Sequence, residues 1–118
     1  MTEKFHDILR RKMDEYVHFI YKITKAFPGE ELYGATSQLR RATLSVILNN
    51  IEGFARKRVL VRVNFFEIYY GSLQESKYLL SFSYKEGWLK TTDYEAANQL
   101  AEEISAMLWK TIENIKLS

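Results

Sequence analysis

Several polar side chains occur at helical spacing inside an apolar part of the sequence, where either acid–base chemistry or a structural network could use them. The segment 45–58, SVILNNIEGFARKR, sets two asparagines, a glutamate and a glycine among aliphatic residues and then ends on three basic residues. Gln38, Ser45 and Glu52 are seven residues apart, so they share one side of a helix, and Asn49 falls on the neighbouring apolar stripe. Such a row could transfer protons or fix the register of two helices.

A second row of polar residues interrupts the apolar stripe of the segment 62–86. Ser72 and Glu75 follow the same 3- and 4-residue steps as the aromatic and aliphatic residues around them. Each row has a glycine beside it, and a glycine inside a helix costs about 0.5–1 kcal/mol against alanine, so we expect each to mark a close approach of two backbones. We call the two rows together the polar seam: Gln38, Ser45, Asn49, Glu52, Gly53, Gly71, Ser72 and Glu75.

The polar seam has two interpretations. The one we favour is an inter-helix network that fixes register, in which Arg41, Asn49 or Ser72 pairs with Glu75, because a buried carboxylate without partners is costly. The alternative is acid–base use of Glu52 and Glu75. No residue is recognisable as a substrate-binding group, so we expect no catalytic residue and no enzymatic activity.

A set of basic residues is the best candidate for a binding function. The net charge of the chain is only +2, but residues 36–62 carry a local net charge of +5 and residues 93–118 one of −3. The basic residues could contact the phosphates of RNA or another nucleic acid, or they could face solvent or pair with acids of another helix, such as Glu102, Glu103 and Glu113. The candidate nucleic-acid-binding residues are Arg40, Arg41, Arg56, Lys57, Arg58 and Arg62.

Other chemistry finds little support in the sequence. Two Glu-x-x-His spacings, Glu3–His6 and Glu15–His18, fall on the same expected helix, whereas a di-iron bundle needs such pairs from two helices. The chain has no cysteine, so it has no disulfide, thiolate zinc site or cysteine nucleophile. No phosphate-binding loop motif appears. We expect no metal site and no cofactor.

Length and composition indicate one domain spanning residues 1–118. The chain is 47% hydrophobic and 27% charged, which is ordinary for a globular protein. The first residues carry frequent charges and no apolar core of a signal peptide, and no apolar run approaches the roughly 18 residues that a membrane span needs. We expect a cytoplasmic protein without membrane contact.

The chain has only one proline and five glycines, so few residues interrupt a helix and long helices are favoured. We predict an all-α, up-and-down (antiparallel) four-helix bundle with helices at roughly 3–26, 36–55, 62–86 and 92–116. Thr36 or Ser37 would cap the second helix, Gly87 would end the third, and Thr92 with Glu95 would form a capping box for the fourth. The start of the third helix stays open, because an apolar Val-Leu-Val stands where a polar turn is expected.

The third predicted helix carries more apolar surface than a lone bundle buries. Between Val63 and Tyr84, 12 of 22 residues are apolar or aromatic, and they surround the helix. A helix in a bundle needs one apolar stripe, so an apolar surface all round needs a second partner. We therefore predict a homo-oligomer.

Spaced motifs in this sequence also resemble a known family. They are F-P-x-E-E at 27–31, S-Q-L-R-R-A at 37–42, Ser45, Asn49, Glu52-Gly53 and Gly71-Ser72-Leu73-x-Glu75. The chain from about residue 5 to residue 89 resembles the bacterial four helix bundle protein family, also called the S23 ribosomal protein family because members are encoded in intervening sequences of some 23S rRNA genes. Gln38 and Arg41 match its pattern together with the other members of the polar seam.

The resemblance implies a ring-like homopentamer of four-helix bundles, with no assigned catalytic activity and a suspected connection to RNA or to a nucleic-acid-processing protein. The sequence departs from the family pattern at Asn49–Gly53, where the family usually has Asn-Ile-Ala-Glu-Gly, and at Val59–Val61, where it tends to have a polar connection. We expect a scaffold or adaptor with an RNA partner, and a protein-interaction scaffold without a nucleic-acid role is the alternative.

Overall fold

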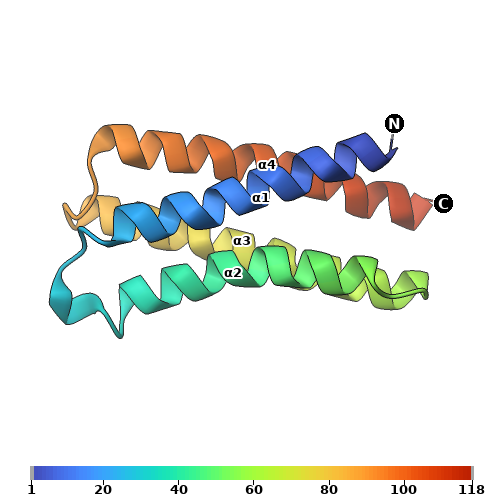
Figure 1. Ribbon diagram of the computed structural model, residues 1–118, viewed down its shortest axis with the longest axis horizontal. Helices are drawn as coiled ribbons and strands as arrows, with labels where there is room; N and C mark the ends of the chain where they lie inside the picture. The colour runs from blue at the N-terminus through green and yellow to red at the C-terminus, as the bar shows by residue number, and fades with distance from the viewer. Residues whose placement is uncertain (1, 118) are drawn as a thin grey trace.

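Four long α-helices make up the computed structural model, which describes the backbone of residues 2–117 and the side chains of residues 4–115. The helices are α1 (Thr2–Thr24), α2 (Ala35–Phe54), α3 (Val59–Lys85) and α4 (Thr91–Leu117), with a short 3-10 helix, η1 (Gly29–Glu31), before α2. Figure 1 shows them lying along one long axis, with the α2–α3 turn at the same end as the two ends of the chain. The predicted fold is confirmed, and its described part contains no strand.

The helices form a square in cross-section. α1 packs against α2 and α4, and α3 packs against the same two helices, whereas within the described residues the diagonal pairs make no close backbone contact. α3 therefore stands at the corner between two adjacent sides of the bundle, one formed with α2 and one with α4.

The core follows the predicted stripe of α1. All six residues of that stripe are buried: Leu9, Met13, Tyr16, Ile20, Ile23 and Phe27. The hydroxyl of Tyr16 lies 2.8 Å from the hydroxyl oxygen of Ser76, so this buried polar group has a partner. Burial raises the pKa of Tyr16 well above its ordinary value, and the hydroxyl stays neutral.

The ends of the helices agree with the sequence only in part. Gly87 ends α3 as predicted: it adopts φ +82°, its N–H donates to the carbonyl of Tyr84 (3.0 Å), and the next N–H donates to that of Ser83 (3.0 Å). The predicted cap of α2 is wrong, because Gly34 occupies the N-cap position and Thr36 is buried inside the helix. α4 begins at Thr91, one residue before the predicted capping box.

The largest difference in boundaries lies at the start of α3. We predicted Arg62, but the helix begins at Val59, and the N–H of Arg62 already donates to the carbonyl of Arg58 (2.9 Å). The apolar Val59–Val61 stretch is thus the first helical turn, although Leu60 is 80% exposed. Only four residues, 55–58, connect α2 to α3. Over the described residues, no helix combines the length and the apolar character that crossing a membrane requires.

Candidate functional site

The buried asparagine of α2 is Asn50. It is only 2% exposed; its Oδ1 accepts a hydrogen bond from Arg10 Nε (2.6 Å), and its Nδ2 donates to the hydroxyl of Tyr69 (3.1 Å). These bonds join α1, α2 and α3 through one amide. Burial raises the pKa of Tyr69 well above its ordinary value, so its hydroxyl stays neutral and accepts from the amide.

The prediction that Asn49 occupies the core stripe is wrong. Asn49 is half-buried, and its Nδ2 bonds within its own helix, to the carbonyl (2.8 Å) and the hydroxyl (2.9 Å) of Ser45. A rotation of α2 by one residue, about 100°, decides which of the two asparagines points inward. The signal that sequence reasoning missed is Arg10, which supplies a donor from α1 to the inner position.

The two glycines of the polar seam have different surroundings. A Cβ on Gly53 would lie 2.6 Å from Cε1 of Phe66 and 3.2 Å from Cβ of Phe65, so α2 and α3 do approach closely there. The same expectation for Gly71 is wrong, because a Cβ there would meet no atom within 4 Å and the residue is exposed. Only the first glycine serves packing of the helix pair.

The remaining residues of the polar seam lie at its outer edge. The hydroxyls of Ser45 and Ser72 are 2.9 Å apart, which joins the two rows as expected. Glu52 and Glu75 are both exposed, and Glu52 pairs with Arg56 (2.6 Å). The predicted buried network around the two carboxylates is therefore wrong: α3 turns Phe66, Tyr69 and Leu73 inward instead.

An open groove runs between α2 and α3 on this outer side. It has a volume of about 400 Å³, and no hydrogen bond or ion pair among the described residues links Arg41 to Glu75. Arg41 on α2 and Glu75 on α3 therefore line the groove as unpaired charges of opposite sign, with small side chains between them. The residues lining this α2–α3 groove are Gln38, Arg41, Ala42, Ser45, Ser72 and Glu75.

The predicted basic residues divide between two places. Arg40 and Arg41 belong to the first half of α2, 15 or more residues before Arg56, which places them about 23 Å from it along the helix axis. The guanidinium of Arg40 is already engaged: its Nε donates to Oγ1 of Thr24 (2.8 Å), and it lies over the ring of Tyr21 (4.8 Å). The side chain of Arg40 therefore links α2 to α1.

The other basic residues form what we call the basic turn: Arg56, Lys57, Arg58 and Arg62. Arg56 lies over the ring of Phe65 (5.2 Å), and Arg62 lies over that of Phe54 (5.8 Å) while its Nη2 donates to the carbonyl of Arg56 (2.8 Å). Lys57 and Arg58 are exposed, and their side chains make no polar contact with the described residues. The turn thus holds two positive charges on aromatic faces and presents two more to solvent.

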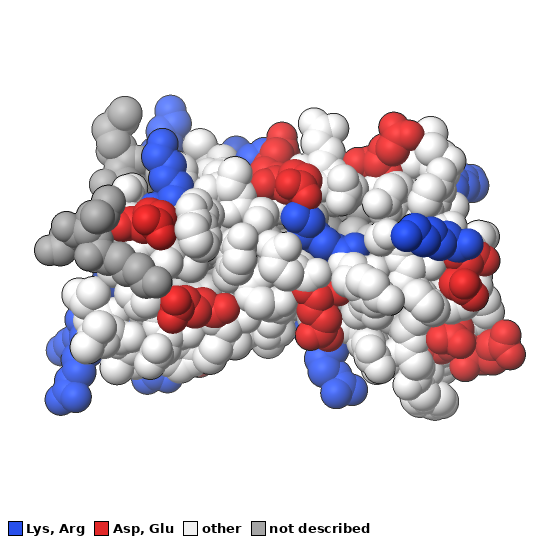
Figure 2. Space-filling view, turned by 180° about the vertical axis from the view of Figure 1, so that it is seen from behind, with Lys and Arg blue, Asp and Glu red and all other residues white. Residues whose placement is uncertain are grey.

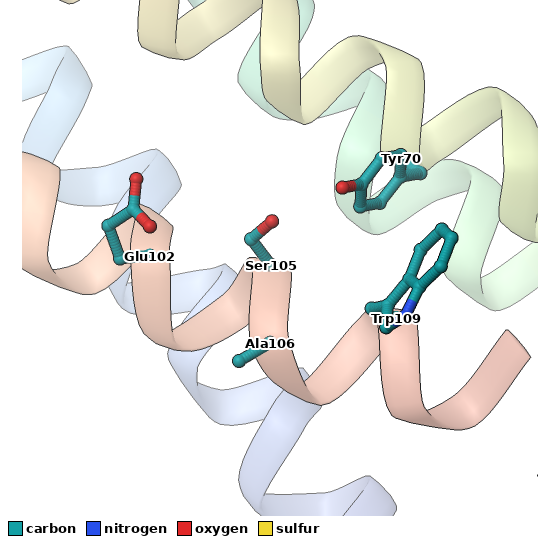
Figure 3. Close-up of a pocket in the computed structure, with 5 residues that line it drawn as sticks. All are labelled: Tyr70, Glu102, Ser105, Ala106 and Trp109. Carbon is teal, nitrogen blue, oxygen red and sulfur yellow. The ribbon is translucent and has the colours of Figure 1, made fainter. Parts of the chain in front are cut away.

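A second groove lies between α3 and α4, and sequence reasoning missed it. The rings of Tyr70 and Trp109 stand 5.6 Å apart at one end of it, and Figure 3 shows them beside Ser105 and Ala106. Trp109 is 52% exposed. The signal in the sequence was Trp109 itself, a large aromatic residue next to the buried Leu108. The residues lining this α3–α4 groove are Tyr70, Glu102, Ser105, Ala106 and Trp109, and its volume is about 330 Å³.

Polar contacts hold the far end of the α3–α4 groove. Nε2 of Gln74 donates to Oγ of Ser105 (3.2 Å), and Nζ of Lys77 lies 2.5 Å from a carboxylate oxygen of Glu102. Within the part of the chain that the structure describes, no three acidic, histidine or cysteine side chains gather where they could hold a metal ion.

Fold and surface together define a small antiparallel four-helix-bundle protein whose polar groups gather in open grooves and in one basic turn. The family described as 23S rRNA-intervening sequence protein matches residues 7–110, and the chain belongs to this family. A crystal structure of a protein with unknown function from the S23 ribosomal protein family of Bacteroides thetaiotaomicron VPI-5482 is similar in fold. Its TM-score is 0.85 at 20% identity, over 92% of this chain and 98% of that one. No curated protein matches.

Proposed function

We propose that this protein is a non-enzymatic, homo-oligomeric scaffold of the cytoplasm that binds RNA through its basic turn. The observation that carries the proposal is the pair Lys57 and Arg58, exposed and unpaired among the described residues at one end of the bundle. Phosphate groups are the partners that such solvent-facing cations meet on a nucleic acid, and releasing their counterions drives binding.

The start of α3 adds a second attraction for phosphate. Its N-cap residue, Arg58, makes no side-chain cap, and the first turn contains no acidic residue. The backbone N–H groups of that turn therefore have no carboxylate partner, and the positive end of the helix dipole lies next to the two free cations. Arg56 and Arg62 are held by aromatic rings, which leaves the basic turn ordered before it binds.

Assembly would multiply the effect of this turn. Each copy in a homo-oligomer repeats the basic turn, so a long RNA could contact several copies and gain avidity. The name of the family refers to an intervening sequence of 23S rRNA, which fits an RNA partner. The proposed subunit number, five, rests on the resemblance described above.

Binding of a fluorescent single-stranded RNA, followed by anisotropy over a range of salt concentrations, tests the proposal. The slope of log K against log salt is negative, and each lost phosphate contact makes it less steep by about 0.7, so Lys57→Ala with Arg58→Ala should make it less steep by about 1.4. The matched control is Lys22→Ala with Lys25→Ala, which removes two exposed lysines near the C-terminal end of α1, at the opposite end of the bundle from the basic turn. No binding at about 50 mM salt, or equal binding by both double variants, would contradict RNA binding.

The alternative is a protein-interaction scaffold without RNA, and the exposed apolar residues of α3 favour it. Leu60, Ile68 and Tyr78 are each more than half exposed, which is more than a solvated helix needs. The absorbance of the purified oligomer at 260 nm, before and after nuclease treatment, separates the two: nuclease-sensitive absorbance supports an RNA partner, and its absence supports the alternative.

A further inference from the structure

α3 and α1 differ in what they expose. Every exposed residue of α1 between residues 4 and 24 is a charged residue or a histidine, whereas α3 exposes Leu60, Ile68, Tyr78 and Phe82. Figure 2 views the molecule from behind and shows broad uncharged surface between scattered charges. α1 is thus suited to face water, and α3 to face protein.

Apolar surface continues from α3 onto both sides of the bundle. On the side formed with α2, Leu48 (55%) and Ile68 (52%) are exposed below the α2–α3 groove. On the side formed with α4, Tyr70 and Trp109 line the α3–α4 groove. Tyr70 follows Ile68 by two residues, about 3 Å along the helix. The two apolar areas therefore lie at the same height on adjacent sides of the molecule.

Two contact areas on adjacent sides dictate the kind of assembly. A heterologous contact, in which one area of each copy meets the other area of the next, closes into a ring when the angle between the areas fits. Adjacent sides of a square bundle meet at about 90°, which a ring of four needs, and a ring of five needs about 72°. In either ring the shared corner, α3, points to the centre and the opposite corner, α1, points outward.

We propose that the α2–α3 side of each subunit packs against the α3–α4 side of the next, with bundle axes parallel and α3 around the central axis. This deepens the proposed function, because it rests on the homo-oligomer proposed there and assigns its two contact surfaces. α2 of one subunit then meets α4 of its neighbour, and the two α3 helices meet nearer the centre. Leu48 would pack on Ala106 and Trp109 of the neighbouring subunit.

Charges above the apolar areas match in this arrangement. The Ser45–Ser72 contact sets Arg41 level with Glu75 across the α2–α3 groove. In the α3–α4 groove, the Gln74–Ser105 and Lys77–Glu102 contacts place the carboxylate of Glu102 and the ammonium of Lys77 at nearly the same height along the bundle. Stacking the sides brings Arg41 onto Glu102 of the neighbouring subunit and Glu75 onto Lys77 of the neighbouring subunit. Both wall charges that lack an internal partner acquire one of opposite sign.

Because Arg41 and Glu75 each meet a charge of opposite sign only when unlike sides are in contact, the charges favour this orientation. Exposed ion pairs contribute about 0–1 kcal/mol each. We therefore assign orientation to the charges and most of the association energy to the apolar areas.

Cysteine cross-linking tests the contact directly, because the natural chain has no cysteine. Leu48→Cys with Ala106→Cys places one thiol on each proposed surface, and mild oxidation should give a covalent ladder that ends at the ring size. Either substitution alone should give no ladder, and a mixture of the two single variants should stop at dimers. The matched control, Leu48→Cys with Arg11→Cys, puts the second thiol on the outward face of α1 and should not form the ladder.

A charge swap tests the orientation, with light scattering for mass and circular dichroism for helix content. Arg41→Glu and Glu102→Arg should each shift the protein at least tenfold toward smaller species, and the double variant should restore the parent mass. A parent protein that is monomeric at micromolar concentration would overturn this assembly and the oligomeric part of the proposed function. A parent oligomer that gives no Leu48–Ala106 ladder would overturn only the assignment of surfaces.

Discussion

The inner and outer sides of the α2–α3 pair carry similar polar residues in different states. On the inner side, Asn50 has two partners from other helices, and Gly53 lies against Phe66. On the outer side, Asn49 bonds only within its helix, a Cβ on Gly71 would meet no atom, and Arg41 is not paired with Glu75. Polar residues at helical spacing therefore serve two purposes side by side in this helix pair. The inner set holds the subunit together, and the outer set is free to meet another molecule.

Exchanging the two asparagines for alanine should give the largest contrast. Asn50→Ala leaves the hydroxyl of buried Tyr69 and the guanidinium of Arg10 without their partner, and we expect it to lower the free energy of unfolding by about 2–4 kcal/mol. Asn49→Ala removes bonds inside one helix and should cost less than about 1 kcal/mol. Urea denaturation followed by circular dichroism measures both. Equal losses would remove the distinction between the two sides.

The two glycines should respond to alanine with opposite signs. Gly53→Ala puts a methyl group 2.6 Å from a ring carbon of Phe66, so overpacking should lower the free energy of unfolding by about 1–3 kcal/mol. Gly71→Ala meets open space and should raise it by about 0.5–1 kcal/mol through helix propensity. The same denaturation experiment decides. A stabilising effect at position 53 would mean that the helices are not in close contact there.

Protonation of His6, which lies near the basic turn, should have the smallest effect on stability of the changes considered. Nδ1 of His6 is buried without a hydrogen-bond partner, and the ring lies 4.5 Å from that of Phe54. Burial, with help from the charges of Arg10 and Arg62, holds the pKa of His6 below its ordinary value. The unfolded chain therefore binds the proton more tightly, and stability present above about pH 6.5 should fall as the pH is lowered from there.

Thermal unfolding between pH 7 and pH 5 measures this dependence. His6→Phe keeps an aromatic ring against Phe54 without a titrating group, so its melting temperature should fall less than that of the parent over the same range. An identical fall in both proteins would show that protonation of His6 does not oppose folding.

Much of the architecture could be predicted because it depends on periodicity. The stripe from Leu9 to Phe27 steps by three and four residues, and every member is buried as that pattern requires. Gly87 could be predicted as a helix end because few other residues adopt its positive φ. Both features are local, so neighbouring residues contain the information.

The candidate site could be predicted less well because it depends on how each helix is rotated. Asn49 and Asn50 are adjacent in sequence, and a donor 40 residues away, on Arg10, satisfies the inner one. The placement of Glu75 was wrong for a related reason. The stripe chosen for α3 was one of several that its apolar residues allow, and only packing against α2 and α4 selects Tyr69 and Leu73 as the inner residues.

The four-residue connection between α2 and α3 has a consequence for how the chain reaches its fold. These two helices share the most extensive packing in the bundle, and the shortest loop joins them, so closing that loop costs the least chain entropy. The contact between Gly53 and Phe66 spans only 13 residues, and local contacts of this kind form quickly. We expect the α2–α3 hairpin to form first and to open last, with its amides the slowest to exchange with solvent. α1 and α4 would then dock onto a hairpin that already carries both rows of the polar seam.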